Sequence, residues 1–337
     1  MNHVTPADTL GRPLRDLRIS VTDRCSFRCV YCMPREVYDD HDYLKRSEVL
    51  TYDEIARIAR IAVSLGVSKV RLTGGEPLLR REIDTLVAKI ADLDGVVDLA
   101  MTTNGLQLRT SAHRLAEAGL RRVTVSLDAI EDAVFRRMID TDVDVSQVLD
   151  AIDAAADAGL GPVKVNAVIR RGWNEDQVIP LADHFRHTGH IVRFIEYMDV
   201  GSTNRWRHDE VVDSRDLIDT IGAIWPIEPV DPNYRGEVAQ RWRYRDDGGE
   251  VGFISSVSAP FCGTCTRLRL SAEGRLYTCL FSTTGTDLRG PLRSGATDAD
   301  LTELIGSIWT TRSDRYSELR GATPLATPKV EMSYIGG

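Results

Sequence analysis

Residues 25–34 read Cys-Ser-Phe-Arg-Cys-Val-Tyr-Cys-Met-Pro and place three cysteines in the pattern C-x3-C-x2-C. The stretch follows a β-rich run at residues 17–22, so the pattern predicts a loop after a strand. Three thiolates this close can bind three corners of a cubane iron–sulfur cluster and leave the fourth iron open to a ligand. A structural zinc site with His41 as fourth ligand is the alternative, and an odd number of close cysteines disfavours a disulfide.

The chain on either side of this loop alternates between short β-rich runs and stretches with apolar residues three and four apart. The predicted strands cover residues 17–22, 69–73, 96–101, 122–127, 163–169 and 191–198, and the predicted helices cover 52–65, 82–93, 112–118, 146–158 and 176–187. This alternation predicts an α/β fold with a parallel sheet, either doubly wound or closed into a partial barrel. Polar residues gather where the strands end, and this favours the barrel.

The rhythm changes after residue 200, where Gly, Pro and Trp become frequent. Two hairpins are predicted at residues 242–254 and 266–277, followed by a helix around residues 299–311. We therefore expect two regions, a barrel over residues 1–225 and a carboxyl-terminal region over residues 226–337.

Composition narrows the classes of function. The chain has 337 residues and a formal net charge of −8, so it is a poor general binder of nucleic acid or membrane surfaces. An anionic ligand must then be held by a local group of Arg and Lys. No signal peptide and no transmembrane run is predicted. We expect a cytoplasmic protein, and in that reducing compartment clustered cysteines are more often ligands or catalytic groups than disulfides.

A second group of three cysteines, Cys262, Cys265 and Cys279, flanks the second predicted hairpin. A zinc ribbon is the ordinary explanation of such spacing, but it needs four ligands. No histidine follows His208, so the region offers no obvious fourth ligand apart from carboxylates. The deficit favours a second iron–sulfur cluster with an open position.

The stretch 25–34 resembles the signature of the radical S-adenosylmethionine (SAM) superfamily. The resemblance implies a TIM-like partial (β/α)6 barrel in which the open iron, held by Cys25, Cys29 and Cys32, chelates SAM and reduces it to methionine and a 5′-deoxyadenosyl radical. It also implies SAM contacts at four positions, one of them in the Gly-Gly-Glu motif at residues 74–76; these are Tyr31, Gly75, Ser126 and Met198. On local sequence alone, Tyr31 and Met198 are equally well explained as core residues.

Together with the second cysteine group, the runs at residues 71–77, 163–166, 194–201, 262–269 and 274–280 closely resemble the GTP 3′,8-cyclases of molybdenum cofactor biosynthesis. That resemblance implies two [4Fe–4S] clusters, with the guanine of GTP on the open iron of the second. It also implies that Cys25, Cys29, Cys32, Arg267 and Arg269 are catalytic residues. The GTP-binding residues that it implies are Arg18, Arg71, Thr102, Lys164, Arg267, Leu268 and Arg269. Two arginines that alternate along a strand share one face, which suits anion binding, although a solvated face is the usual outcome.

The resemblance further implies that hydrogen is abstracted from C3′ of the ribose and that C3′ then joins guanine C8. The product would pass to a cyclic pyranopterin monophosphate synthase, and a flavodoxin or ferredoxin would supply electrons. A homodimer is compatible with the family. The Gly336-Gly337 end would reach into the active site, whereas a frayed tail is the ordinary alternative. Two rival functions are a peptide-modifying radical SAM maturase and a zinc-binding interaction protein.

Overall fold

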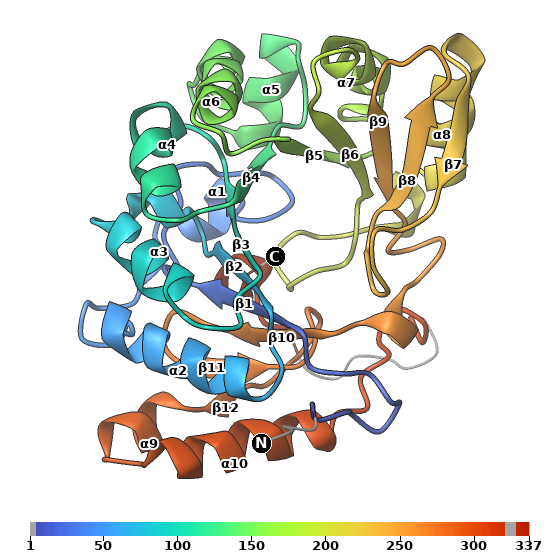
Figure 1. The fold of residues 1–337 in the computed structure, drawn as a ribbon. Helices are drawn as coiled ribbons and strands as arrows, with labels where there is room; N and C mark the ends of the chain where they lie inside the picture. Colours follow the sequence, from blue (N-terminus) through green and yellow to red (C-terminus); the bar gives the residue numbers. More distant parts are fainter. Residues whose placement is uncertain (1–4, 321–327, 337) are drawn as a thin grey trace.

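A computed structural model describes residues 5–320 and 328–336 of the chain, which form one large sheet with helices on its outer side (Figure 1). The strands are β1 (Asp16–Ser20), β2 (Lys69–Thr73), β3 (Asp98–Thr103), β4 (Arg122–Ser126), β5 (Lys164–Ile169), β6 (Ile191–Glu196), β7 (Ile227–Val230), β8 (Gln240–Tyr244), β9 (Glu250–Ile254), β10 (Arg267–Leu270), β11 (Arg275–Tyr277) and β12 (Thr286–Asp287). The helices are α1 (Arg35–Tyr38), α2 (Tyr52–Ser64), α3 (Ile83–Ala91), α4 (Leu108–Glu117), α5 (Asp132–Ile139), α6 (Val145–Asp157), α7 (Val178–Phe185), α8 (Ser214–Ile224), α9 (Arg289–Arg293), α10 (Asp298–Thr310) and α11 (Met332–Ile335).

The strand order in the sheet is β12-β11-β10-β1-β2-β3-β4-β5-β6-β9-β8-β7. Neighbours from β10 through β1–β6 to β9 all pair in parallel, and the strands beyond them pair antiparallel at both edges. The sheet curves around its inner face in Figure 1. The predicted partial barrel with a carboxyl-terminal extension is confirmed.

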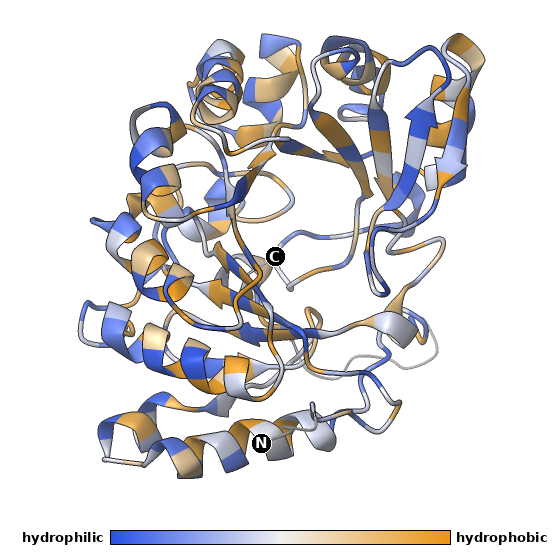
Figure 2. Ribbon diagram, in the orientation of Figure 1, coloured by the Kyte–Doolittle hydropathy of each residue, from blue (hydrophilic) through white to orange (hydrophobic). Residues whose placement is uncertain are grey.

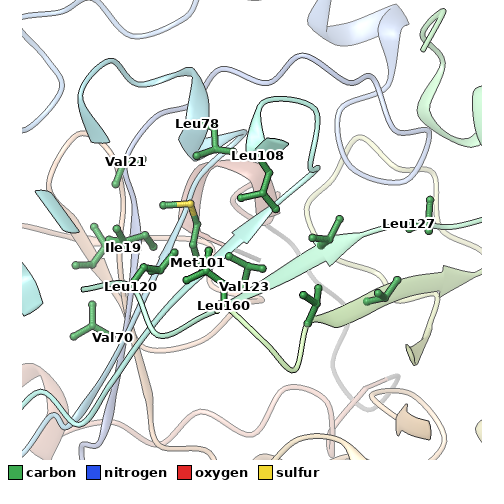
Figure 3. Close-up of a cluster of buried hydrophobic side chains, with 14 of the residues drawn as sticks. Ile19, Val21, Val70, Leu78, Met101, Leu108, Leu120, Val123, Leu127 and Leu160 are labelled. Carbon is green, nitrogen blue, oxygen red and sulfur yellow. The ribbon is translucent and has the colours of Figure 1, made fainter. Parts of the chain in front are cut away.

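Side chains alternate between the two faces of the sheet, because successive residues of a strand point to opposite sides. The outward set is apolar and packs under the helices; Ile19, Val70, Met101 and Val123 belong to this buried cluster (Figure 3). The inward set is largely polar, so orange and blue bands alternate along several strands in Figure 2. The fold is therefore stabilised by the layer between sheet and helices, and the interior is free to bind a polar ligand.

Local sequence explains where the long outer helices begin. Thr51 accepts a hydrogen bond from the Glu54 amide and the Glu54 side chain accepts one from the Thr51 amide, a capping box that starts α2. Thr297 and Asp300 form the same arrangement at the start of α10. The predicted helix 112–118 is longer than expected and begins at Leu108.

The carboxyl-terminal region adds a parallel strand to each side of the six-stranded unit. β9 pairs with β6, and β10 pairs with β1. The two predicted hairpins are confirmed as β8–β9 and β10–β11. The elements that were not predicted are the helices α1, α5, α8, α9 and α11 and the strands β7 and β12. A domain boundary near residue 225 stays a prediction. None of the helices in the described ranges has the length and hydropathy needed to cross a membrane.

Candidate functional site

A single cavity in the barrel collects almost every side chain that the sequence singled out. Its lining includes both cysteine groups and the polar residues of the inner face. The predicted residues that line it are Arg18, Cys25, Cys29, Tyr31, Cys32, Arg71, Gly75, Thr102, Ser126, Lys164, Met198, Cys262, Cys265, Arg267, Arg269 and Cys279. Leu268 differs, because its side chain is fully buried in the outward-facing core. Only its backbone is available to a ligand in the cavity.

The first cysteine loop leaves the carboxyl end of β1 and rests on the end of α5. The amides of Arg28 and Val30 donate to the carbonyls of Ile139 and Met138 at 2.9 and 3.1 Å. The Cys32 amide donates to the Cys29 carbonyl at 2.9 Å, which closes a tight turn between these two ligands. Burial, together with the nearby Glu76 carboxylate, raises the pKa of the Cys25 thiol to about 12. A positive metal centre is what would favour three thiolates in such surroundings.

Glu76 ties the loop after β2 to the loop after β3. Its carboxylate is buried and accepts hydrogen bonds from Thr103 Oγ1 and the Asn104 amide, both at 2.7 Å. Burial raises the pKa of Glu76 to about 7. Asn104 in turn donates to Ser26 Oγ at 2.9 Å and lies 3.9 Å from Cys25 Sγ. The loop after β3 therefore helps to orient the first cysteine ligand.

Gly75 lies against the backbone of the first cysteine loop. A Cβ atom at this position would sit 2.2 Å from the Arg24 carbonyl oxygen and 3.1 Å from the Cys25 nitrogen. The Gly75 amide donates to the Thr22 carbonyl, and the Glu76 amide donates to the Arg24 carbonyl. Close approach of two backbones explains why glycine occupies this position.

Tyr31 is held by a buried carboxylate on the fourth strand's loop. Its hydroxyl donates to Asp128 Oδ2 at 2.8 Å, and the Val168 amide donates to the other oxygen at 2.8 Å. Burial raises the pKa of Asp128 to about 6. Tyr31 thus lines the cavity with a fixed orientation, next to the cysteines on either side of it in the sequence.

Cations dominate the inner face of neighbouring strands. Arg18 on β1 is in register with Arg269 on β10 and with Arg71 on β2. Burial and the charges of Arg269 and Arg71 lower the pKa of Arg18. Burial and the neighbouring Arg193 lower the pKa of Lys164 to about 7. Like charges held together in a buried space need a multivalent anion to neutralise them.

The second cysteine group lies where β10 begins, at the amino ends of the parallel strands. Arg267 Nε lies 3.4 Å from Cys265 Sγ, and Arg312 donates to the same sulfur at 3.1 Å. Burial alone would raise the pKa of Cys265, but Arg267 and Arg312 lower it to about 6. Arg12 donates to the Cys262 carbonyl at 2.8 Å. The loop therefore offers a stabilised thiolate inside a cationic frame.

Each of the two cysteine groups supplies three thiols, which is the number that a cubane with one open iron takes. All six cysteines are free thiols. Among the described residues, no three His, Cys, Asp or Glu side chains converge as ligands of a single ion, and His41 lies between the rings of Tyr38 and Tyr43 instead. A cubane does not require such convergence, because each thiolate binds its own iron atom.

Several residues that line the cavity or hold the predicted site residues in place were not predicted from the sequence. Arg193 lines the cavity, donates to Asn166 Oδ1 at 2.9 Å and is 9% exposed. Its signal was present as one cation inside the otherwise apolar run Ile191–Glu196. Asn104, Asp128 and Arg312 carried no signal beyond an ordinary turn, strand end or helix end.

The carboxyl-terminal segment also reaches the cavity. Met332 and Ser333 of α11 line it, and the Arg269 guanidinium donates to the Gly336 carbonyl. A Cβ at Gly336 would lie 2.5 Å from Thr73 Cγ2. The expectation of a tail that reaches the site is supported as far as Gly336, and Gly337 lies outside the described residues.

Comparison with known proteins gives concordant results. Residues 19–185 match the model of the Radical SAM superfamily, and residues 190–318 match that of Molybdenum Cofactor Synthesis C. The chain is 54% identical to the GTP 3′,8-cyclase of Acidothermus cellulolyticus, 52% to that of Xanthomonas axonopodis pv. citri and 49% to that of Staphylococcus aureus, with 98% of each chain covered.

Among solved structures, Streptococcus suis SuiB bound to S-adenosylmethionine is similar, with a TM-score of 0.62 and 16% identity over 91% of this chain and 70% of that chain. Methylornithine synthase matches with a TM-score of 0.51 and 16% identity over 64% of this chain and 63% of that one. At these identities the likeness extends to the fold alone.

Proposed function

We propose, from the premise that the chain belongs to the GTP 3′,8-cyclase family of radical SAM enzymes, that it converts GTP to (8S)-3′,8-cyclo-7,8-dihydroguanosine 5′-triphosphate in molybdenum cofactor biosynthesis. The observation that carries the proposal is the cavity lined by both cysteine groups and by the inner-face cations. A reaction that needs a radical source and a bound nucleotide triphosphate requires both in one enclosed space.

Membership of the radical SAM superfamily implies a [4Fe–4S] cluster and SAM. When bound, these groups supply the radical that removes hydrogen from the substrate. We assign Cys25, Cys29 and Cys32 as the cluster ligands and Tyr31, Gly75, Ser126 and Met198 as SAM contacts. Support comes from their common cavity and from the Glu76–Asn104 and Asp128 contacts that orient the loop and Tyr31.

We further propose that Cys262, Cys265 and Cys279 hold a second [4Fe–4S] cluster whose open iron faces guanine. The contacts of Cys265 support this assignment, because Arg267 and Arg312 both lie against its sulfur and would compensate the negative charge of that ligand. The second cysteine group comes from the opposite end of the parallel strands from the first. A nucleotide between the two would lie with its ribose toward SAM.

The triphosphate is assigned to the inner-face cations Arg18, Arg71 and Lys164, with Arg267 and Arg269 nearer the base; Thr102 and the Leu268 backbone would complete the site. Thr102 accepts a hydrogen bond from Arg71 at 3.1 Å, which fixes the guanidinium toward the cavity. These side chains bind, orient and neutralise the anion. Their burial excludes water from the space where C3′ and C8 must meet.

The wider setting is proposed on chemical grounds. A reductive cleavage needs a low-potential electron donor, such as a flavodoxin or ferredoxin, and the cyclised nucleotide needs a consumer, a cyclic pyranopterin monophosphate synthase. A reducing, cytoplasmic compartment is proposed because all six cysteines are assigned as iron ligands and would have to stay reduced. A homodimer stays a prediction.

The test is 5′-deoxyadenosine formation by anaerobically reconstituted protein with SAM and dithionite, with and without GTP. We expect strong stimulation by GTP and a cyclised product. Cys279→Ala should retain the iron of the first cluster and cleave SAM but form no cyclised product, whereas Cys25→Ala should do neither. Cleavage that ignores GTP would remove the assigned substrate, and zinc in both cysteine groups would overturn the radical chemistry.

A further inference from the structure

A buried carboxylate next to Met198 gathers side chains from a distant part of the chain. Asp199 Oδ2 accepts from Lys329 Nζ at 2.7 Å and from the Tyr316 hydroxyl, and Oδ1 accepts from Arg320 Nε at 2.9 Å. The Lys329 amine also donates to the Asp199 backbone carbonyl at 2.5 Å. Asp199 and Lys329 are each 9% exposed. Lys329 is therefore held at two points by one residue of the β6 loop.

The same cluster contacts the second cysteine group. The rings of Phe281 and Tyr316 stack with centroids 4.5 Å apart and planes 25° apart. The Lys329 amine lies 4.5 Å from the Tyr316 centroid and 5.3 Å from that of Phe281. The Phe281 amide lies 3.5 Å from Cys279 Sγ. One ion cluster thus joins the β6 loop, the second cysteine loop and the carboxyl-terminal segment.

A second contact lies two residues further along the carboxyl-terminal segment and three to four residues further along the β6 loop. The Glu331 carboxylate accepts from the Ser202 amide at 2.8 Å and from Thr203 Oγ1 at 3.0 Å. Gly201 has φ +67°, and a Cβ there would sit 2.0 Å from Glu331 Oε2. The backbone of the β6 loop is therefore shaped to receive the segment that continues into α11 and Gly336.

The Asp199 contact is the stronger of the two, because it combines ammonium, guanidinium and phenol donors around a buried charge. Burial alone would raise the pKa of Asp199, but the hydrogen bonds from Lys329 and Tyr316 and the charge of Arg320 lower it. Loss of the Asp199 charge would leave two cations without their shared anion. The Glu331 contact uses neutral donors only.

We propose that Asp199 is a positioning residue that latches residues 328–336 over the cavity, so that this segment is seated only when the β6 loop and the second cysteine loop are both in place. Because Asp199 directly follows Met198, a ligand that orders Met198 strengthens the latch, and the latch in turn favours that ligand by the same factor. The catalytic consequence rests on the proposed function. An unseated segment leaves the cavity open to water, so SAM cleavage loses its coupling to cyclisation.

The test is hydrogen–deuterium exchange of the anaerobic holoenzyme, read by mass spectrometry on the peptide that covers residues 328–336. Asp199→Asn keeps the shape of the side chain and removes its charge. We expect exchange in that peptide to rise at least tenfold, with exchange in β1–β6 unchanged, and a smaller rise in the matched variant Glu331→Gln. This readout needs neither GTP nor turnover, so it stands apart from the substrate assignment.

A second readout is the amount of 5′-deoxyadenosine formed per cyclised product, which we expect to rise several-fold in Asp199→Asn. If that variant does not fold, Lys329→Met removes the partner charge from the other side of the latch and should give the same exchange pattern. Unchanged exchange at residues 328–336 in either folded variant would overturn the proposal. So would an equal rise across β1–β6, because that result indicates general destabilisation.

Discussion

Replacement of Arg193 by methionine is expected to weaken GTP binding and to stabilise the ligand-free protein at the same time. Arg193 points from β6 into the cavity, where it donates to Asn166 Oδ1 and lies 3.4 Å from Thr124 Oγ1. Burial, followed by the charges of Arg71 and Arg122, lowers the pKa of Arg193 to about 9. Methionine has a similar reach but no charge.

The effect on GTP binding and the effect on stability have opposite signs, and each can be given its own magnitude. A hydrogen bond to a charged group contributes about 1.5–3 kcal/mol, so the loss of one guanidinium–phosphate contact should weaken GTP binding roughly 10- to 150-fold. In the free protein, each unit by which the Arg193 pKa is lowered represents about 1.4 kcal/mol of cost to the charged form. The variant no longer bears this cost, but it loses the hydrogen bond from Arg193 to Asn166. We therefore expect the free energy of unfolding of the ligand-free protein to rise by about 2 kcal/mol. That corresponds to a rise in Tm of about 3 °C.

The sign of the pH dependence follows from the direction of the shift. Arg193 is a base whose folded-state pKa is depressed, so its charge destabilises the fold at every pH below about 9 and ceases to do so as the pH rises above that value. The Arg193 guanidinium is charged in both folded and unfolded chains between pH 6 and 8, so the variant should keep a higher Tm throughout this range. The difference in Tm should narrow toward pH 8, because Lys164, whose pKa burial and Arg193 lower to about 7, loses its proton there and is no longer repelled by Arg193.

The assay is anaerobic calorimetric titration with GTP, paired with thermal unfolding without it. Arg243→Met is the control, because Arg243 lies on β8 with a side chain 60% exposed and paired with Glu228; neither quantity should change. Unaltered GTP affinity in Arg193→Met would show that no phosphate lies at Arg193. Weaker binding together with a lower Tm would indicate damage to the fold and refute the trade-off.

Two further predictions concern Lys164 and Gly75. The Lys164 pKa of about 7 leaves the amine mostly neutral at pH 8, and a bound triphosphate should favour its protonated form. Calorimetric titrations in buffers of different ionisation enthalpy should therefore show uptake of roughly one proton per GTP, and Lys164→Met should abolish this uptake. A heat of binding that does not depend on the buffer would contradict the prediction. Gly75→Ala would force a Cβ to 2.2 Å from the Arg24 carbonyl, so reconstituted protein should lose iron from the first cluster and at least tenfold in SAM cleavage. Gly222→Ala is the control, because the nearest atom to an added Cβ there lies 3.7 Å away. Full iron content in Gly75→Ala would show that the first cysteine loop can shift to accommodate the Cβ and would refute the prediction.

Periodicity predicted the elements whose character is local. Alternation of short β-rich runs with helical stretches was enough to predict the parallel sheet, and the polar residues at the strand ends favoured the barrel. The cysteine spacings predicted both candidate cluster sites. Cys25, Cys29 and Cys32 must lie close together in any fold, whereas Cys279 returns to the other two cysteines of its group through the predicted hairpin β10–β11.

Contacts between distant parts of the chain were beyond the reach of the sequence. Nothing in the residues of β9 or β10 says that one pairs with β6 and the other with β1, because strand pairing depends on the packing of the whole sheet. Arg312 lies just beyond the predicted helix 299–311 and was not singled out, yet it donates to Cys265 Sγ. Asp199 meets Lys329 across 130 residues, and no local pattern indicates that meeting.

The second cysteine loop is framed by both ends of the chain, and this has a consequence for biosynthesis. Arg12 and Arg312 donate to the carbonyls of Cys262 and Cys265, and β10 covers the edge of β1. At about 5–20 residues per second, Cys279 leaves the ribosome roughly 10–50 s after Cys32. During that interval the first three thiols are available to iron carriers while the second site does not exist, and the β1 edge lacks its neighbour. The first cysteine group therefore becomes available to iron carriers before the second, and nascent chains that stop before β10 expose the edge of β1.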